Sequence, residues 1–262
     1  MSEYQENSVV QTIEWLTDTT YRLTLHAPRI AAAAQPGQFI MADCGATLDP
    51  LLRRPFSIHH AAVATGTLQL LVKTVGRGTQ MLSAVHPGDS VSLIGPLGRG
   101  FHLVQELPVC LVGGGVGIAP LLFLAEKISV QASAADSCVV LLGSRTGAEI
   151  QPLVPAFSEL GCLVRIATDD GSLGHHGLVS DLLAPYLSWA QKVYVCGPFP
   201  MMATIAGFCR EAAVPCEVSL EAHMACGLGA CLGCTVQGAA GSYKHVCKHG
   251  PVFNAEEVAW IR

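Results

Sequence analysis

Hydrophobic and polar positions alternate along much of the first hundred residues of the chain. Residues 21–26 alternate one by one, which is the period of a β-strand with a single buried face. Short apolar stretches between Gly- and Pro-containing turns predict further strands at residues 38–41, 56–58, 68–74 and 90–94. With the pattern starting at Thr12, about six short strands are expected to close into a small antiparallel β-barrel.

A different pattern begins after residues 95–100, where continuous apolar runs replace the alternation. Residues 108–112 form such a run, as in a parallel strand buried on both faces, and lead into a glycine-rich turn and a helix predicted at 121–127. The unit then repeats, with strands expected at 138–142, 163–167, 192–195 and 216–220, and helices at 153–160, 180–187 and 200–213. Alternating strands and helices predict a doubly wound parallel sheet with helices on both faces.

These patterns divide the chain into three expected units: a barrel over 1–99, an α/β unit over 100–215 and a small C-terminal unit over 216–262. Residues 107–125 carry no charge, but four glycines and two prolines divide this stretch, so we expect no membrane span. A net charge of −5 without a Lys/Arg-rich run argues against a nucleic-acid partner. The odd number of cysteines, eleven, and the lack of a signal-like N-terminal segment favour a reducing cytoplasm.

Four of the cysteines form a metal-binding motif near the C-terminus. Cys226, Cys231 and Cys234 have the spacing C-x4-C-x2-C, and Cys247 follows after twelve residues. This spacing is typical of plant-type [2Fe-2S] clusters, which are held by four thiolates. Glycines between the cysteines let the backbone wrap closely round a cluster. A structural zinc site and unligated thiols are the alternatives, although zinc sites more often show two separate C-x2-C pairs.

Two segments of the predicted barrel carry groups that suit a diphosphate. Arg54-Pro55-Phe56-Ser57 puts a guanidinium and a hydroxyl at a strand start, where a solvated arginine is the simpler interpretation. Gly76-Arg77-Gly78-Thr79 leads into a short helix at 80–82, and such a segment either binds an anion or only makes a turn. Two phosphate-competent segments on one barrel favour a dinucleotide.

The α/β unit has a candidate nucleotide edge at the carboxyl ends of its strands. Gly113, Gly114, Gly115 and Gly117 follow the first strand, where such a sheet binds a phosphate, although the G-x-G-x-x-G form is not present. Cys196-Gly197-Pro198 ends the fourth strand, so its backbone and thiol would face the same crevice; a buried cysteine before a turn is the alternative. Residues 168–174 end the third strand, as a loop or as a nucleotide contact.

Together these motifs resemble the ferredoxin–NADP reductase superfamily, in which a flavin-binding barrel precedes a nicotinamide-binding domain. Over essentially its whole length the chain is very similar to the electron-transfer subunits of NAD-dependent (class 1B) dihydroorotate dehydrogenase, the PyrK family. The segments that carry the resemblance are Arg54-Pro55-Phe56-Ser57, Val75-Gly76-Arg77-Gly78-Thr79, Gly113-Gly114-Gly115-Val116-Gly117, Asp169-Asp170-Gly171-Ser172, Cys196-Gly197-Pro198, Met224-Ala225-Cys226-Gly227-Leu228-Gly229-Ala230-Cys231 and Val246-Cys247-Lys248-His249-Gly250-Pro251-Val252-Phe253. The last two are the most specific, because the wider superfamily lacks such a C-terminal cluster.

The resemblance implies three cofactors and their binding residues. FAD would be held by Arg54, Pro55, Phe56 and Ser57, lie along Leu71, Val72 and Lys73, and have phosphate bound by Gly78 and Thr79. NAD would be bound by Gly113, Gly114, Gly115, Gly117, Cys196, Gly197 and Pro198. The [2Fe-2S] cluster would be held by Cys226, Cys231, Cys234 and Cys247. His223 and His249 replace the arginine and aspartate common in the family, so a Rieske-type mixed site is a further alternative.

The resemblance also implies a function in pyrimidine (UMP) biosynthesis. A catalytic partner subunit carrying FMN would oxidise dihydroorotate to orotate, and electrons would pass from FMN through [2Fe-2S] and FAD to NAD+. Two copies of each chain are expected, as a heterotetramer, and NADH-linked dye reduction is expected of the isolated subunit. Since this chain shows neither a dihydroorotate site nor an assignable catalytic acid–base pair, the cluster is expected to face the partner, with Pro251, Val252 and Phe253 near that contact.

Two questions stay open at this point. Arg145 follows the second strand, where an arginine accepts the 2′-phosphate of NADP, and Glu149 is the only nearby acid, so local residues do not decide between NAD and NADP. The alternative functions are a flavin and iron–sulfur subunit of another NAD(P)H-linked complex, of the ferredoxin:NADP or sulfide reductase type, and a zinc-binding scaffold without redox activity.

Overall fold

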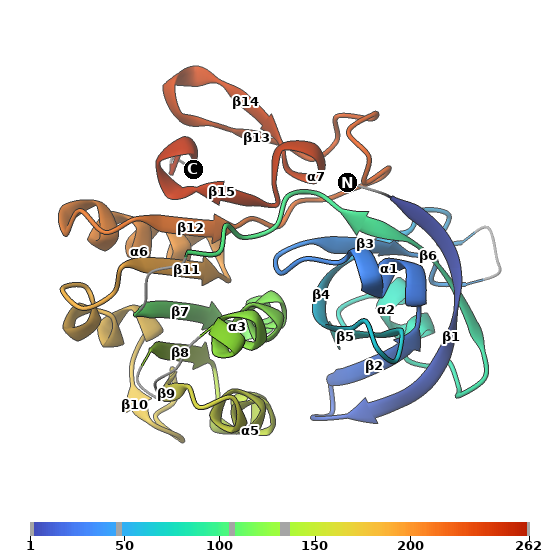
Figure 1. Cartoon of the computed structure of the whole chain (residues 1–262), viewed down its shortest axis with the longest axis horizontal. Coiled ribbons are helices and arrows are strands. Elements are labelled where there is room, and N and C mark those ends of the chain that lie inside the picture. The colour runs from blue at the N-terminus through green and yellow to red at the C-terminus, as the bar shows by residue number, and fades with distance from the viewer. Residues whose placement is uncertain (1–2, 46–48, 105–107, 132–136, 261–262) are drawn as a thin grey trace.

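The computed structural model of the chain describes residues 3–45, 49–104, 108–131 and 137–260. In Figure 1 the first strands close into a barrel on the right, in the antiparallel order β1-β2-β5-β4-β3-β6, as predicted. The barrel elements are β1 (Tyr4–Trp15), β2 (Thr20–His26), α1 (Pro28–Ala33), β3 (Phe39–Ala42), β4 (Arg54–Ala62), β5 (Thr67–Lys73), α2 (Arg77–Leu82) and β6 (Ser90–Leu97).

The first strand starts earlier than the sequence pattern indicated. It begins at Tyr4 rather than Thr12, and its first half pairs with β6 whereas its second half pairs with β2. Only Ser8 and Val10 of this strand are buried, so polar residues dominate it and conceal the alternation. Pairing on both edges therefore forms a strand that hydrophobicity alone does not predict.

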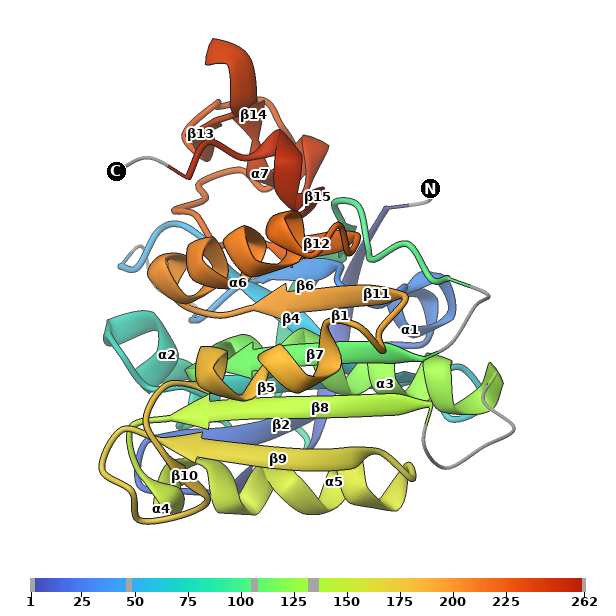
Figure 2. The same cartoon turned by 90° about the vertical axis from the view of Figure 1, so that its left-hand side faces the viewer.

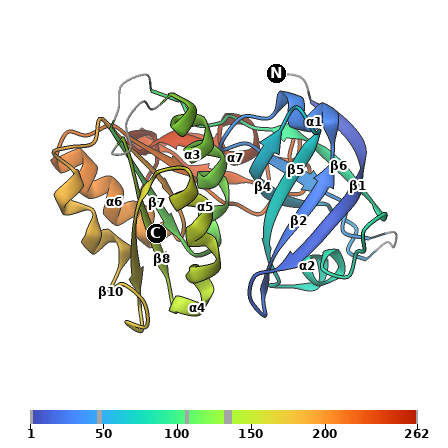
Figure 3. The same ribbon diagram turned by 60° about the horizontal axis from the view of Figure 1, so that its bottom comes forward.

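The α/β unit is a sheet in the order β10-β9-β8-β7-β11-β12-β15, parallel except for β15. Figure 2 shows its central strands side by side, and Figure 3 shows α3 and α5 on the face toward the barrel and α6 on the other face. Its elements up to α6 are β7 (Val109–Gly114), η1 (Gly115–Ile118), α3 (Ala119–Gln131), β8 (Cys138–Ser144), α4 (Gly147–Ile150), η2 (Gln151–Leu153), α5 (Val154–Glu159), β9 (Leu163–Thr168), β10 (His175–His176), β11 (Lys192–Cys196) and α6 (Phe199–Glu211).

The helix predicted at 180–187 is wrong. The chain instead forms two short 3₁₀ turns, η3 (Val179–Leu182) and η4 (Ala184–Tyr186). Pro185 is the second residue of η4, and because proline has no N–H the hydrogen bonding of η3 cannot continue through it as a regular α-helix.

The C-terminal segment completes the sheet and then folds over its edge. It comprises β12 (Cys216–Ser219), β13 (Thr235–Gln237), η5 (Ala239–Gly241), β14 (Tyr243–His245), α7 (Val246–His249), β15 (Val252–Asn254) and η6 (Ala255–Glu257). Because β12 pairs with both β11 and β15, sheet hydrogen bonding crosses the boundary placed between residues 215 and 216. The division into units at 99 and 215 stays a prediction.

The barrel and the sheet are joined through α3. Phe123 of this helix packs within the barrel's hydrophobic core. His59 Nδ1 of β4 hydrogen-bonds to the carbonyl oxygen of Ala119 at 2.8 Å, and His60 Nδ1 pairs with Glu126 Oε1 at 2.6 Å. In the described ranges, no helix is long and apolar enough to cross a membrane; Leu107, at the start of the uncharged stretch, lies outside them.

Candidate functional site

A cavity of about 450 Å³ lies where the barrel meets the other two units. All nine residues that the resemblance assigns to FAD line it: Arg54, Pro55, Phe56, Ser57, Leu71, Val72, Lys73, Gly78 and Thr79. The cavity is also lined by Val116 and Ala119 of the sheet unit and by residues 219–224, which lead from β12 to the cysteine motif. We refer to it as the flavin cavity. The barrel, the sheet unit and the C-terminal segment thus all contribute residues to the flavin cavity.

The two phosphate-competent segments of the barrel meet in this cavity. A Cβ on Gly78 would lie 3.2 Å from both Cγ and Nε of Arg54, so the arginine packs directly over this glycine. The Thr79 hydroxyl already accepts hydrogen bonds from the backbone N–H groups of Val75 and Gly76, at 3.0 and 3.1 Å. Thr79 therefore shapes the turn with its side chain, and the Arg54 guanidinium brings the positive charge that a diphosphate needs.

Sequence reasoning missed the cavity wall contributed by the segment after β12. Glu221, His223 and Met224 line the flavin cavity. Glu221 is open to the cavity, yet burial among the surrounding protein raises the pKa of its carboxyl group. The position of this segment directly after a sheet strand was the available signal, because carboxyl ends of parallel strands collect at one edge.

A second cavity of about 430 Å³, the nucleotide cavity, lies along the carboxyl edge of β7, β8 and β9. Gly114, Gly115 and Pro198, from the predicted NAD set, line it. Cys196 pairs with Gly113 in the parallel register of β11 and β7, so the two glycine motifs are neighbours. This is the point at which strand order reverses, the place where open α/β sheets bind ligands.

The other predicted NAD residues, Gly113, Gly117, Cys196 and Gly197, form the packed layer behind this cavity. A Cβ on Gly117 would lie 2.6 Å from the Cys196 carbonyl oxygen and from Gly197 Cα, so only glycine allows this approach. Gly113 and Gly114 belong to β7 itself, and the turn starts at Gly115, whose φ of +56° favours glycine. Cys196 is only 1% exposed, which differs from the expectation that its thiol faces the crevice.

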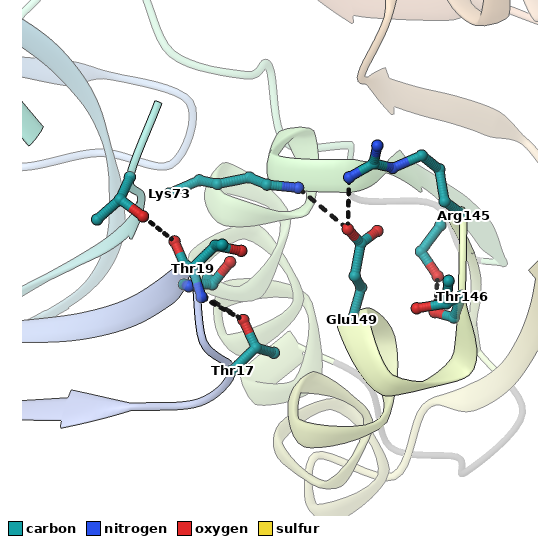
Figure 4. A network of polar contacts seen from close by, with 9 residues as sticks. Thr17, Thr19, Lys73, Arg145, Thr146 and Glu149 are labelled. Atoms are coloured by element: carbon teal, nitrogen blue, oxygen red, sulfur yellow. Dashed lines mark hydrogen bonds and ion pairs between the residues drawn. The ribbon is translucent and has the colours of Figure 1, made fainter. Parts of the chain in front are cut away.

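Residues 168–174, for which loop and nucleotide contact were equal alternatives, form a tight turn. The Thr168 hydroxyl donates to the Leu173 carbonyl oxygen at 2.9 Å, and Asp170 accepts from the Ser172 N–H at 3.0 Å. Asp169 lines the nucleotide cavity. Near it, Lys73, Arg145 and Glu149 form an ion-pair network that reaches from the barrel to the sheet unit (Figure 4).

The four cysteines of the motif form two pairs. Cys234 Sγ lies 3.2 Å from Cys247 Sγ, and both side chains are buried. Cys226 lies within side-chain hydrogen-bonding reach of Cys231, which is exposed. Across residues 3–45, 49–104, 108–131 and 137–260, no three His, Cys, Asp or Glu side chains are placed as ligands of a single ion. Two pairs of thiols fit a cluster of two irons, each of which takes two thiolates.

The backbone around these thiols is suited to sulfur that carries negative charge. Cys226 Sγ accepts hydrogen bonds from the N–H groups of Leu228 and Cys231, and Cys247 Sγ accepts one from Gly229. Burial opposes the shift, but these N–H donors lower the pKa of Cys226 to about 6. Burial and the contact with Cys234 raise the pKa of Cys247 to about 12. Iron ligation would convert all four thiols to thiolates.

Gly227 and Leu232, in the loop that carries the cysteines, have positive φ angles, and Gly227 lies against the barrel. Gly227 has φ +71°, and a Cβ there would lie 2.5 Å from Cγ of Met41 in β3. Leu232, between Cys231 and Cys234, has φ +61°, a strained value for a leucine. The cysteine motif therefore wraps tightly at its start, next to the barrel and the flavin cavity.

The two histidines that depart from the family pattern have other roles. His249 Nδ1 accepts a hydrogen bond from the backbone N–H of His245 at 3.0 Å, and the two rings stack. His223 lines the flavin cavity. The Rieske-type alternative therefore gains no support from their placement.

The expectation that Pro251, Val252 and Phe253 lie near the partner contact stays a prediction, but their side chains are not on the surface. All three are buried, and Val252 and Phe253 belong to β15, which hydrogen-bonds to β12. The exposed apolar side chains of the cysteine motif are instead Leu228 and Leu232, at 47% and 53% exposure.

Comparisons with known proteins agree with this arrangement. Residues 9–102 match the family described as "Oxidoreductase FAD-binding domain", 111–207 match "Oxidoreductase NAD-binding domain", and 221–259 match "Iron-sulfur cluster binding domain of dihydroorotate dehydrogenase B". A curated relative from Desulforamulus reducens, "Dihydroorotate dehydrogenase B (NAD(+)), electron transfer subunit", is 44% identical over 96% of this chain and 97% of its own. A relative of the same name from Geobacillus kaustophilus is 38% identical over 97% and 98%.

Solved structures show the same architecture. The structure of an NADH-dependent reduced ferredoxin-NADP oxidoreductase is 29% identical and superposes with a TM-score of 0.86, over 97% of this chain and 90% of that one. The ferredoxin reductase of carbazole 1,9a-dioxygenase, 21% identical, shares the fold with a TM-score of 0.67 over 82% and 68%.

Proposed function

The chain belongs to the family of electron transfer subunits of NAD-dependent dihydroorotate dehydrogenase B, and from this premise we propose how its residues serve that role. It is an oxidoreductase subunit with an FAD-binding, an NAD-binding and an iron–sulfur cluster-binding domain. The observation that carries the proposal is the flavin cavity, whose walls come from the barrel, the sheet and the segment leading to the cysteines.

Each part of the chain has a separate task in this proposal. When bound, FAD exchanges electrons in pairs with nicotinamide and singly with an iron–sulfur cluster, and this chemistry belongs to the cofactors. Arg54 and Gly78 hold the FAD diphosphate, Pro55, Phe56 and Ser57 line the flavin, and Leu71, Val72 and Lys73 lie beside it. Thr79 shapes the phosphate turn. Cys226 with Cys231, and Cys234 with Cys247, each hold one iron.

The nicotinamide nucleotide is proposed to bind along the carboxyl edge of the sheet. Gly114, Gly115 and Pro198 contact it directly. Gly113, Gly117, Cys196 and Gly197 set the distance between β7 and β11 from behind. This division of roles is supported by which of these residues line the nucleotide cavity.

We further propose that the partner is an FMN-containing catalytic subunit and that two copies of each chain assemble. The partner removes two electrons and two protons from dihydroorotate to give orotate, and NAD+ accepts the two electrons with one proton. A cytoplasmic location is proposed as well, supported by eleven free thiols in the described ranges.

The test is reconstitution with a candidate FMN subunit. The two chains are co-expressed and purified through a tag on this chain, and NADH formation is followed after dihydroorotate is added. We expect NAD+ reduction that requires both chains, and NADH-dependent dye reduction by this chain alone. Dye reduction without any dihydroorotate-linked activity would assign the subunit to another NAD(P)H-linked complex. A colourless protein that contains zinc would overturn the redox assignment.

A further inference from the structure

The charged side chains that line the nucleotide cavity are evenly divided by sign. Lys73 and Arg145 are the cations, and Glu149 and Asp169 are the acids. Lys73 ends β5 of the barrel, whereas the other three follow β8 or β9 of the sheet. The way in which these four groups pair decides which ligand charge the cavity accepts.

Glu149 is bonded to both cations. Its Oε1 accepts hydrogen bonds from Arg145 Nη2 at 2.8 Å and from Lys73 Nζ at 3.3 Å (Figure 4). Burial opposes ionisation, but these two bonds hold the pKa of Glu149 below its usual value, so the carboxylate is charged at neutral pH. Figure 4 shows the two cations reaching Glu149 from opposite sides.

The pairing changes what Arg145 offers to a ligand. In doubly wound sheets an acid near the second strand accepts hydrogen bonds from the ribose hydroxyls of NAD, and an arginine there accommodates the 2′-phosphate of NADP. Arg145 directly follows β8, and its side chain is 72% exposed, but its guanidinium already donates to Glu149. A phosphate bound through Nη2 would have to displace that carboxylate, and one bound through the other N–H groups of Arg145 would lie beside it.

Asp169 adds to the same effect. It lines the nucleotide cavity, and its negative charge contributes, after Glu149, to raising the pKa of Arg145. A 2′-phosphate brings further negative charge into a site that already has two carboxylates, and like charges brought together cost free energy. Ribose hydroxyls, in contrast, donate to carboxylates.

We propose that Glu149 determines specificity for NAD(H) over NADP(H), by occupying Arg145 and presenting its carboxylate to an unphosphorylated ribose. The inference rests on the proposed function, since it requires that this cavity binds a nicotinamide dinucleotide. Glu149 thus resolves the choice that the sequence left open between Arg145 and its neighbouring acid. Specificity arises from a repulsive element as well as an attractive one.

The test compares two probes that differ only in the 2′-phosphate. ADP-ribose and 2′-phospho-ADP-ribose are titrated into the purified subunit with its cofactors by calorimetry, and dye reduction with NADH and NADPH is measured in parallel. The wild type should bind ADP-ribose at least about tenfold more tightly. Glu149→Gln should tighten 2′-phospho-ADP-ribose by about tenfold and weaken ADP-ribose by about three- to tenfold, because a neutral amide is a poorer acceptor for the ribose hydroxyls than a carboxylate.

A double variant and a matched control identify the mechanism. Arg145→Gln added to Glu149→Gln should abolish the gain, because the released arginine is the proposed phosphate ligand. Glu126→Gln also removes an acid that joins the sheet unit to the barrel, through His60, but Glu126 does not line the nucleotide cavity. This control should leave the ratio of the two Kd values unchanged.

Three results would overturn the inference. An unchanged Kd ratio in Glu149→Gln would remove Glu149 from specificity, and a gain that survives in the double variant would remove Arg145. If Glu149→Gln does not fold, Arg145→Gln alone is decisive, since it leaves the Lys73–Glu149 contact in place. A loss of 2′-phospho-ADP-ribose binding of about tenfold there would show that Arg145 binds phosphate despite Glu149. Failure of the wild type to bind either probe or oxidise NADH would instead overturn the proposed function.

Discussion

Two single residues, His59 and Gly117, each determine a close contact between parts of this molecule. His59 acts through a buried hydrogen bond, and Gly117 acts through its lack of a side chain. His59 is fully buried between the barrel and α3, and its ring nitrogen donates to the Ala119 carbonyl oxygen. Gly117 has no side chain, and the backbone at the end of β11 occupies the space that one would need. The His59 contact therefore depends on the protonation state of the ring, whereas the Gly117 contact depends only on the volume of the side chain at that position.

His59 should make stability dependent on pH. Burial lowers the pKa of His59 from 6.5 to about 4, because a charged ring lacks solvation there. The unfolded chain therefore takes up this proton first, so stability falls as the pH drops from about 6.5 to about 4. Between pH 7 and pH 5 this group should account for on the order of 2 kcal/mol.

The measurement is urea unfolding at pH 7 and pH 5 for the wild type and His59→Asn. Asparagine keeps a hydrogen-bond donor but does not titrate, so the variant should lose less stability on acidification. His26→Asn, at an exposed position, is the control and should behave as the wild type. Equal pH slopes in all three proteins would contradict the prediction.

Gly117→Ala should weaken nucleotide binding. The new methyl group would lie 2.6 Å from backbone atoms of Cys196 and Gly197, and backbone cannot yield as a side-chain tip does. We expect a loss of about 1–3 kcal/mol in stability and weaker ADP-ribose binding by about tenfold. Calorimetry and thermal unfolding check both. The control is Gly207→Ala, in α6 with open space round its Cβ, which should instead stabilise the protein by about 0.5–1 kcal/mol. If Gly117→Ala binds ADP-ribose with wild-type affinity, the steric argument is wrong.

At the scale of elements, the sequence predicts those parts whose pattern is local. Short sequence segments are enough to predict the buried strands β7, β8 and β11, because each is a continuous apolar run. The spacing of Cys226, Cys231, Cys234 and Cys247 likewise predicts the cluster motif by itself. The first half of β1 could not be predicted from its sequence, because pairing with β6 forms this part of the strand and its hydrophobicity does not. The contact between Lys73 and Glu149 joins residues 76 positions apart, so no local sequence pattern predicts it.

Cys231→Ala should remove the cluster and leave the flavin. Cys231 is an exposed member of the pair with Cys226 and does not line the flavin cavity. We expect iron and sulfide to fall to background while flavin absorbance and NADH-dependent dye reduction persist. Cys209→Ala, at a buried thiol in α6, should keep its iron. Retention of full iron and sulfide by Cys231→Ala would exclude Cys231 as a ligand.

At the scale of the whole molecule, an ion pair between buried Lys192 and half-buried Glu217 fixes the segment between barrel and sheet. Lys192 Nζ lies 2.9 Å from Glu217 Oε1, and it also donates to the His102 carbonyl oxygen at 3.0 Å. Glu217 accepts from the His102 N–H at 3.0 Å. The connection thus bonds to the two adjacent strands β11 and β12, and this fixes the barrel relative to the sheet.

Lys192→Met should be among the more destabilising substitutions. It leaves the Glu217 carboxylate, which is only 15% exposed, without its cation, and this should cost about 2–4 kcal/mol, somewhat less than for a fully buried pair. Lys192→Met with Glu217→Gln should lose less, because glutamine is neutral and still accepts from His102. Denaturant unfolding measures both. Lys244→Met breaks a more exposed pair with Glu257 and should cost less than about 1 kcal/mol. A double variant less stable than Lys192→Met would contradict this account.

The surface that meets the partner subunit should include the exposed side of the cysteine motif. Leu228 and Leu232 are exposed beside the cysteines proposed to hold the cluster, whereas Val252 and Phe253 are buried. Leu232→Asn removes the apolar side chain at φ +61°, a conformation that asparagine adopts more readily than leucine, so the loop keeps its shape. We expect weaker partner binding by about 1–2 kcal/mol and slower dihydroorotate-dependent NAD+ reduction, with iron content and NADH-dependent dye reduction unchanged. Val63→Asn, at an exposed apolar position after β4 of the barrel, is the control and should leave partner affinity unaltered. Unchanged iron content would exclude a damaged loop as the cause of weaker binding. If Leu232→Asn instead binds the partner as the wild type does, the contact lies on another face.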